Sequence, residues 1–224
     1  MNSMQKDRGI FISVEGGEGV GKSVFLNRLE KIFSERGISF IKTREPGGSP
    51  VAEKLRQIFN KSANKEKLTI EAELFLVSAA RSQHVAQTIR PALERGDWVL
   101  CDRFVDSTRV YQGAMGGIPE VLLEMIINMS TQGLETDVTF LLDCDVATSL
   151  SRVRLRQESS SVEGAGRYDA QAEKFHEKLR EAFLELSRKY PKRFIILDAQ
   201  QETAHLAGEA AKIIQERWSG GKKN

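Results

Sequence analysis

The chain has 224 residues, of which 40% are hydrophobic and 29% charged, and its 33 basic and 31 acidic side chains give a net charge of +2. This length and composition predict one soluble globular domain around a single sizeable core. The near balance of charge argues against a dedicated nucleic-acid binder. With no apolar run of bilayer length and a polar start at residues 1–8, we expect neither a membrane partner nor a signal peptide.

Strand and helix patterns alternate along the chain. Five short apolar strands are predicted at residues 10–14, 38–42, 98–101, 138–142 and 194–197. Helices are predicted at residues 24–33, 51–59, 70–94, 119–131, from about 147, 171–190 and 203–218. The longest helix is expected to bend near Pro91, and residues 219–224 are expected to be disordered.

The alternation predicts the α/β class, with a five-stranded parallel sheet flanked by helices on both faces. Ligands bind such sheets beyond the carboxyl ends of the strands. Residues 16–23, 45–46, 102–103 and Asp198 each follow a predicted strand. We therefore expect these segments to converge at one edge of the sheet.

The two cysteines, Cys101 and Cys144, stand at the ends of apolar strands. We interpret them as buried free thiols, the alternative being a disulfide or redox pair. Free thiols indicate a reducing compartment, so the expected location is cytoplasmic.

The most specific motif follows the first predicted strand. Residues 16–23 read Gly-Gly-Glu-Gly-Val-Gly-Lys-Ser and fit the phosphate-binding pattern G-x-x-x-x-G-K-[ST] without a mismatch. Glycines let successive N–H groups point at an anion, and the following helix N-terminus adds partial positive charge. We predict a P-loop NTPase fold in which Lys22 reaches the phosphates of ATP; a glycine-rich turn without a ligand is the alternative. The predicted ATP-binding residues are Gly16, Gly17, Glu18, Gly19, Val20, Gly21, Lys22, Ser23 and Val24.

A magnesium site is predicted beside this loop. Asp102 ends an apolar strand, where a Mg²⁺-holding acid of a P-loop enzyme is expected, and the Ser23 hydroxyl should take another position on the ion. Arg103 offers a bidentate donor for a phosphate, with an ion pair at the sheet edge as the alternative interpretation. Mg²⁺ is therefore the expected cofactor, carried with ATP.

Four arginines flank the small, polar segment 157–166: Arg152, Arg154, Arg156 and Arg167. A solvated basic face is the usual explanation for such a run of charge. Phosphoryl transfer depends on positioning and on neutralising charge, so a mobile lid that carries arginines would serve it. We favour the lid, with the arginine that reaches the transferred phosphate left open.

The helix predicted at 70–94 offers a candidate base site. Phe75, Ser78 and Arg81 follow one another at intervals of three residues. An aromatic face and a guanidinium on adjoining turns could hold a flat base by stacking and by hydrogen bonding. From the pattern alone, Phe75 is more often a core residue and Arg81 a surface cation.

Together these segments resemble the thymidylate kinases of bacteria, which phosphorylate dTMP to dTDP with ATP on the route to dTTP. The matching motifs, in the family's order, are residues 15–23, Thr43-Arg44-Glu45-Pro46-Gly47-Gly48, residues 73–81, Asp102-Arg103-Phe104, Ser107-Thr108 and Tyr111-Gln112-Gly113. The resemblance implies one kinase domain over residues 1–224, with the phosphate loop at 16–23, a monophosphate-binding region at about 44–113 and a lid at about 152–170. It also implies a homodimer.

The resemblance further implies individual roles. Phe75 would stack on thymine, Arg81 would bind its O4, Arg103 the dTMP phosphate, Glu18 the 3′-hydroxyl side, and Tyr111 would crowd a 2′-hydroxyl. The implied substrate-binding residues are Glu18, Glu45, Pro46, Leu55, Phe75, Ser78, Arg81, Arg103, Ser107, Thr108, Tyr111 and Gln112. The implied catalytic residues are Lys22, Arg103, Arg152, Arg154, Arg156 and Arg167.

Two positions separate this chain from parts of the family. Gly19 stands where one branch carries a catalytic arginine, which points to the branch that supplies this charge from its lid. In the lid, Gly166 precedes Arg167 where an acidic residue is usual. Adenine contacts are unassigned, and residues 198–200 are placed for that role by topology alone.

Two rival functions stay open from the sequence. Another small kinase of the same architecture would keep the phosphate loop and Asp102 without the set Phe75, Arg81 and Tyr111. A nucleotide-dependent switch would hydrolyse its nucleotide slowly without an acceptor. Guanine-binding switches commonly carry an Asn-Lys-x-Asp segment, and none follows Leu142.

Overall fold

A computed structural model describes residues 8–61, 66–159, 168 and 171–218. The predicted tail at 219–224, Arg167 and the part of the predicted lid at 160–167 lie outside the described residues. None of the helices in the described part of the chain combines the length and apolar character that a bilayer crossing requires.

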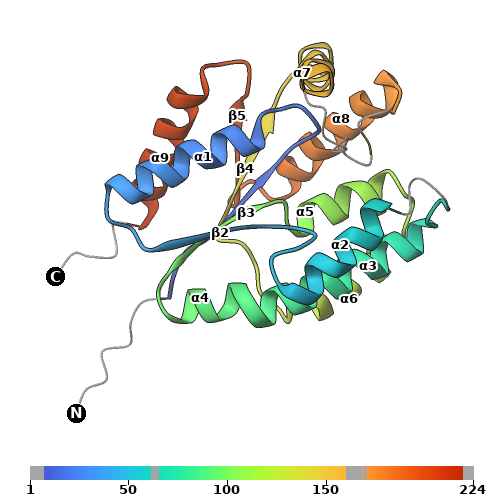
Figure 1. The fold of residues 1–224 in the computed structure, drawn as a ribbon, viewed down its shortest axis with the longest axis horizontal. Helices are drawn as coiled ribbons and strands as arrows, with labels where there is room; N and C mark the ends of the chain where they lie inside the picture. The colour runs from blue at the N-terminus through green and yellow to red at the C-terminus, as the bar shows by residue number, and fades with distance from the viewer. Residues whose placement is uncertain (1–7, 62–65, 160–167, 169–170, 219–224) are drawn as a thin grey trace.

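Five parallel strands form one sheet in the order β2-β3-β1-β4-β5 (Figure 1). The strands are β1 (Phe11–Glu15), β2 (Phe40–Arg44), β3 (Trp98–Asp102), β4 (Val138–Asp143) and β5 (Phe194–Asp198). The predicted number, order along the chain and parallel arrangement are confirmed. β1 is displaced by one residue and β2 by two. The larger displacement arises because the Ile38 N–H bonds to the Phe33 carbonyl and so belongs to the end of the preceding helix.

Alternation along the strands divides the core between the two faces of the sheet. Ile12 and Val14 point to a cluster with α1 (Lys22–Glu35) and α9 (Thr203–Trp218). Phe11 points to the opposite cluster. The helical segments of that second face are α3 (Ile70–His84), η2 (Val85–Ile89), α4 (Arg90–Glu94), α6 (Glu120–Thr131) and α8 (Glu173–Lys189).

Just before Pro91, where a bend is predicted, a π-helical turn, η2, separates α3 from α4. The Arg90 N–H bonds to the Val85 carbonyl five residues back. The helix therefore widens just before Pro91, whose ring would otherwise meet the carbonyl four residues earlier. Helical backbone continues through the widened turn into α4.

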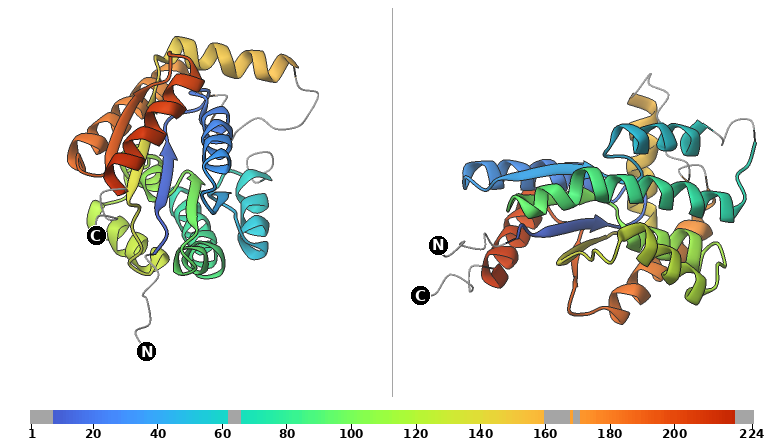
Figure 2. Two further views of the ribbon diagram at one scale, coloured as in Figure 1. Left: turned by 90° about the vertical axis from the view of Figure 1, so that its left-hand side faces the viewer. Right: turned by 90° about the horizontal axis from the view of Figure 1, so that it is seen from below.

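The remaining helices gather at the carboxyl edge of the sheet (Figure 2). They are α2 (Pro50–Lys61), α5 (Val105–Thr108), η3 (Arg109–Ala114) and α7 (Val146–Ser159). Arg44 pairs with Asp102 across β2 and β3, and Asp143 pairs with Asp198 across β4 and β5, so neighbouring strands end level. The predicted convergence of the segments after the strands is confirmed.

Candidate active site

The phosphate loop leaves β1 and turns directly into α1. Its tightest position is Gly19, whose φ is +74°. A Cβ at Gly19 would lie 2.1 Å from the Ser149 carbonyl oxygen and 2.9 Å from Val153 Cγ2, both on α7. The missing side chain therefore lets α7 pack directly on the loop.

That close packing determines which arginines of α7 reach the site. Arg152 and Arg156, one helical turn apart, line the cavity beside the loop. Arg154 is exposed and does not line it, because a step of two residues turns about 200° around a helix. Of the three α7 arginines predicted as catalytic, Arg154 therefore lies outside the cavity wall. Arg152 also donates to the Ala199 carbonyl at 3.1 Å, which links α7 to the loop after β5.

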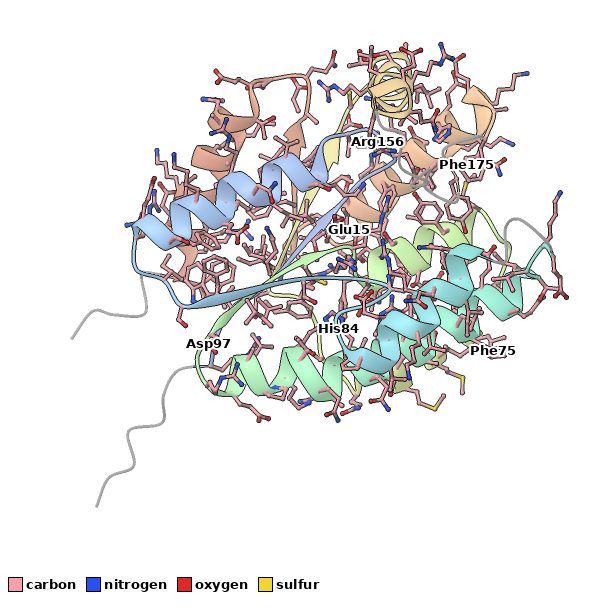
Figure 3. The ribbon with its side chains drawn as sticks, viewed as in Figure 1. Glu15, Phe75, His84, Asp97, Arg156 and Phe175 are labelled. Carbon is pink, nitrogen blue, oxygen red and sulfur yellow. The ribbon has the colours of Figure 1, made fainter. Side chains whose placement is uncertain are left out.

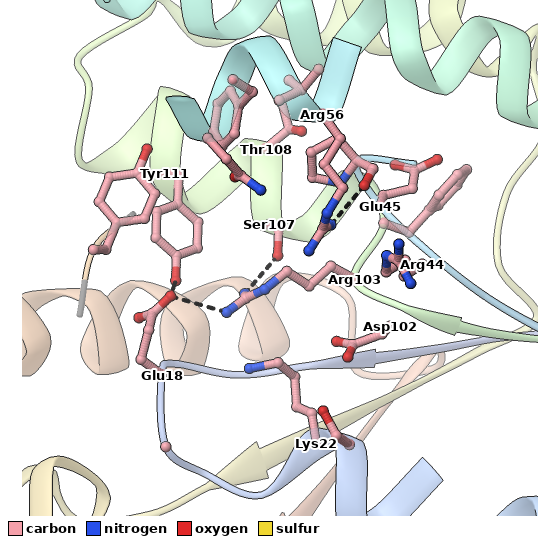
Figure 4. A pocket seen from close by; sticks show the side chains of 18 of the residues that line it. Glu18, Lys22, Arg44, Glu45, Arg56, Asp102, Arg103, Ser107, Thr108 and Tyr111 are labelled. Atoms are coloured by element: carbon pink, nitrogen blue, oxygen red, sulfur yellow. Dashed lines mark hydrogen bonds and ion pairs between the residues drawn. The ribbon is translucent and has the colours of Figure 1, made fainter. Parts of the chain in front are cut away.

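A cavity of about 630 Å³ opens at the carboxyl edge of the sheet (Figure 4). It extends from the phosphate loop to α3 and is covered in part by α7. Most of the predicted site residues line it: Glu18, Gly19, Gly21, Lys22, Ser23, Val24, Glu45, Pro46, Arg81, Asp102, Arg103, Ser107, Thr108, Tyr111, Gln112, Arg152 and Arg156. Gly16, Gly17 and Val20 line instead a smaller cavity of about 20 Å³ behind the loop.

Charged groups of opposite sign meet at the centre of the cavity. Lys22 Nζ donates to the carbonyls of Gly16 (3.0 Å) and Gly17 (2.5 Å). Burial, together with the nearby Arg103 guanidinium, lowers the pKa of Lys22 to about 8. Burial alone would raise the pKa of Glu18, but Arg103 and Lys22 outweigh it and hold this pKa below its usual value. Glu18 is therefore ionised near neutral pH.

Arg103 is held in an uncommon backbone conformation, with φ at 68°. Its Nη1 donates to Ser107 Oγ at 3.0 Å and its Nη2 to Glu18 Oε1 at 3.1 Å. Glu15 fixes the next turn, accepting from the Phe104 N–H and from Ser107 Oγ, each at 2.7 Å. Burial, reinforced by Asp106, raises the pKa of Glu15 to about 7. These contacts over-determine the loop and so hold the strained arginine.

Two further arginines reach the same region, and sequence reasoning missed both as site residues. Arg56 of α2 lines the cavity and donates to the Pro46 carbonyl at 2.7 Å, and Arg44 lines it from the end of β2. Figure 4 shows the Arg56 side chain above that of Arg103, each entering the cavity from a different element. The signal for Arg44 was present, since it lies within the motif at 43–48; nothing in the sequence distinguished Arg56 from other helix surface cations.

The α3 end of the cavity is organised by Arg81, which is only 2% exposed. Its Nε donates to Glu45 Oε2 at 2.7 Å, and its Nη2 donates to Thr108 Oγ1 at 2.8 Å and to the Phe104 carbonyl at 3.4 Å. Nη1 is buried and has no hydrogen-bond partner among the described residues. Because an unpaired buried donor is costly, this nitrogen is the one available to a ligand.

Phe75 does not reach this end of the cavity, so the prediction that it stacks on a base is not supported. The ring is 62% exposed on the outer side of α3 (Figure 3). Phe75 lies six residues before Arg81, which places it about 120° away from Arg81 around the helix axis. A residue four positions before Arg81 is only about 40° away. Val77, four residues before Arg81, accordingly lines the cavity in the place predicted for Phe75.

Two other predicted substrate contacts also lie away from the cavity. Ser78 is buried, and its Oγ has no hydrogen-bond partner among the described residues. Leu55 is half-buried on α2 and does not line the cavity. Leu55 comes one residue before Arg56, and Ser78 comes one residue after Val77; it is Arg56 and Val77 that line the cavity. A shift of one residue turns a side chain about 100° around a helix, which is enough to move it off the cavity wall.

Aromatic side chains close the wall between the two ends. Tyr111 donates to Glu18 Oε1 at 2.6 Å, and its ring lies 4.7 Å from that of Tyr168. Tyr168 also lines the cavity and donates to Glu73 Oε2 at 2.7 Å. Gln112 donates to the same Glu73 oxygen at 3.1 Å. Tyr168 was not predicted as a site residue.

Two oxygen donors fit a magnesium ion at the phosphate end. The Asp102 carboxylate and the Ser23 hydroxyl both line the cavity there, and oxygen is the ligand that Mg²⁺ prefers. Among the described residues, no cluster of three or more His, Cys, Asp or Glu side chains could hold a metal ion by itself. The donor set therefore fits an ion that takes its other ligands from bound phosphates and water.

Comparison with known proteins identifies a family for the chain. The family model described as "Thymidylate kinase" matches residues 14–209. The chain is 40% identical over 210 residues to a thymidylate kinase of Rhodopseudomonas palustris (strain BisB18), covering 94% of this chain and 90% of that protein. It is 41% identical over 214 residues to a thymidylate kinase of Chromohalobacter salexigens, covering 94% of this chain and 99% of that protein.

Proposed function

Because the chain belongs to the thymidylate kinase family, whose members phosphorylate dTMP to dTDP with ATP, we propose that its main cavity holds both nucleotides. One observation carries this assignment. Buried Arg81 keeps a single donor, Nη1, without a partner among the described residues at one end, while the phosphate loop opens at the other. A pyrimidine carbonyl would accept a hydrogen bond from Arg81 Nη1, and a triphosphate would accept hydrogen bonds from the phosphate loop.

At the α3 end we assign the thymine base. Arg81 Nη1 would donate to the base O4, and Val77 would pack against the ring where Phe75 does not reach. Thr108 and Gln112, which also line the cavity, are placed near N3. Cytosine carries an amino group in place of O4, so two donors would face each other and cytosine would be rejected.

The middle of the cavity suits the sugar and phosphate of dTMP. Glu18, which is joined to Tyr111 and Arg103, would accept from the 3′-hydroxyl. Arg103 and Arg56 would take the phosphate between them, since paired guanidinium groups match phosphate geometry. Tyr111 would leave no room for a 2′-hydroxyl.

The phosphate loop would hold ATP. Its N–H groups and the start of α1 would bind the β-phosphate, and Lys22 would exchange its carbonyl partners for phosphate oxygens. Ser23 and Asp102 would hold Mg²⁺, which supplies charge neutralisation for the transferred group. Arg152 and Arg156 would approach the same group from α7.

No side chain is needed as a base in this arrangement. A phosphate oxygen of dTMP is already a competent nucleophile, so the residues have to align it with the γ-phosphorus of ATP and neutralise the charge that spreads over the equatorial oxygens. Arg103, Lys22 and the two α7 arginines line the cavity from three elements and would converge on that position.

We further propose a homodimer through the outer side of α3 and α6. Four apolar side chains there are more than 60% exposed: Phe75 (62%), Val121 (77%), Met125 (66%) and Met129 (73%). On α6 they recur every four residues and so form one stripe. A second copy of the chain would cover it, so Met125→Lys should give a monomer in analytical ultracentrifugation. Leu155→Lys, at an equally exposed site on α7, is the control that should not.

Both cysteines are free and buried, as predicted. Burial raises the pKa of each thiol, which keeps it protonated and unreactive. This state supports our proposal of a reducing, cytoplasmic location.

The substrate assignment is tested by coupled assays with Mg-ATP and a panel of dTMP, dUMP, dCMP and AMP. The expected order of kcat/KM has dTMP first and dCMP lower by at least about 100-fold, the value of a mispaired buried polar contact. Turnover of dCMP or AMP at the rate of dTMP would remove the assignment. Nucleotide hydrolysis that no monophosphate stimulates would favour a switch instead.

A further inference from the structure

His84, the last residue of α3, is completely buried (Figure 3). Its Nδ1 is 3.0 Å from Glu45 Oε1, and its Nε2 is 2.7 Å from Thr43 Oγ1. A carboxylate oxygen can only accept, so Nδ1 carries a proton. The imidazole therefore donates to Glu45 whatever its net charge.

Glu45 passes this constraint to Arg81. Its second oxygen, Oε2, accepts from Arg81 Nε at 2.7 Å, and the carboxylate is only 4% exposed. The orientation of the Arg81 guanidinium is thus determined by Glu45 on one side and by Thr108 on the other. Because the guanidinium is planar, fixing Nε and Nη2 also fixes Nη1.

His84 itself has little room to turn. A Cβ at Gly48 would lie 2.2 Å from His84 Nε2, so the ring packs directly against the backbone of the loop after β2. Thr88 donates to the Gly48 carbonyl at 2.7 Å and holds the same loop from η2. The loop also carries the Pro46 carbonyl, which accepts from Arg56.

We propose that His84 is a positioning residue for base recognition: through Glu45 it holds Arg81 so that Nη1 meets the O4 of the pyrimidine. This inference rests on the proposed function, because it takes Arg81 as the base contact. His84 touches no substrate in this arrangement. Its contribution therefore lies in dTMP binding and in discrimination against a base with an amino group at position 4, and ATP binding is independent of it.

Two near-isosteric substitutions separate the two ring nitrogens. The amide of His84→Asn occupies the place of Nδ1 and keeps the contact with Glu45, whereas the amide of His84→Gln occupies the place of Nε2 and keeps only the contact with Thr43. We expect H84Q to lower kcat/KM for dTMP by about 10- to 100-fold, the range of a lost buried hydrogen bond to a charged group. We expect H84N to stay within about fivefold of wild type.

The measurements are kcat and KM for dTMP, dCMP and ATP in wild type, H84N, H84Q and Thr43→Val. The loss in H84Q should appear in KM for dTMP and in the ratio of dTMP to dCMP, with KM for ATP unchanged. T43V should behave as H84N does. His205→Asn, at an exposed histidine of α9, is the matched control and should equal wild type.

Equal losses in H84N and H84Q, or a loss that moves KM for ATP as much as KM for dTMP, would overturn the positioning role in favour of a general packing role. Thermal unfolding midpoints of the four variants check that each is folded. Failure of the proposed function is a separate result, because it would appear in the wild type as a lack of preference for dTMP.

Discussion

The two ends of the cavity are built in different ways. At the phosphate end, one continuous segment at residues 16–23 forms the loop that lines the cavity, and Asp102, Arg152 and Arg156 add to it from neighbouring elements. At the base end, Arg81 depends on Glu45 from the loop after β2, on Thr108 from α5 and on the Phe104 carbonyl. The first end is a local motif, and the second exists only after four segments have packed together.

This difference predicts different responses to substitution. A local loop keeps its shape when one side chain changes, so damage at the phosphate end should appear in kcat. At the base end, each side chain fixes another, so damage should appear in dTMP binding and in selectivity. The following experiments test that contrast.

The largest effect is expected at the phosphate end. Lys22→Met removes the cavity-lining cation that we propose to face the transferred group, and kcat should fall by at least about 1,000-fold because the developing charge would lose a buried donor. KM for dTMP should change little, and circular dichroism should show an intact fold. A variant with more than a tenth of wild-type kcat would contradict the assignment of Lys22.

The corresponding change at the base end is Arg81→Lys. Lysine keeps the charge but cannot bond Glu45, Thr108 and a base at once, so kcat/KM for dTMP should fall by about 100-fold. Steady-state kinetics should place the loss in KM for dTMP, with KM for ATP within about twofold of wild type. A loss confined to kcat would mean that the two ends are not separable.

Glu15, which is buried and bonds the turn at Phe104 and Ser107, should give a pH-dependent effect on stability. Its pKa is raised from 4.5 to about 7 in the folded chain, so the folded state binds more protons and stability from this group is lost as pH rises between these values. The loss should be about 2–3 kcal/mol. Glu15→Gln keeps an oxygen that accepts from the Phe104 N–H and replaces the titrating oxygen that accepts from Ser107 with an amide NH2 group, so it should lack this loss.

The measurement is urea unfolding of wild type and E15Q at pH 5.0 and pH 7.5. The pKa of Lys22 is lowered to about 8, so below that pH its contribution to the free energy of unfolding is nearly constant. This contribution therefore cancels when the two pH values are compared. Parallel pH dependence in the two proteins would show that Glu15 is ionised at neutral pH.

The smallest effect separates the two candidate base contacts on α3. Val77→Ala removes apolar surface from the cavity wall and should raise KM for dTMP by about 3- to 10-fold. Phe75→Ala should leave KM within about twofold, because the ring lies outside the cavity, and should instead weaken the proposed dimer. A larger rise in KM for dTMP in Phe75→Ala than in Val77→Ala would instead support Phe75 as the residue that stacks on the base.

Much of the fold could be predicted from the sequence, because its signals are local. Short apolar runs between helical patterns predicted all five strands and their parallel arrangement, and the glycine pattern at 16–23 predicted the phosphate loop. The short segments α5 and η3 were missed, since residues 105–114 are too few to show a helical stripe. Lys22, Asp102 and Arg103 were placed correctly at the sheet edge because each follows directly on a strand end or loop of known direction.

Only the tertiary structure decided which face of each helix reaches the site. Leu74, Phe75, Leu76 and Val77 are consecutive apolar residues, so α3 shows no single apolar stripe, and packing against the sheet selects Val77 over Phe75. The same holds for Arg152 and Arg156 over Arg154, and for Arg56, which lines the cavity because α2 packs against the loop after β2. Periodicity along a chain specifies that a helix forms, whereas the rotation of that helix about its axis is set by the neighbours it packs against.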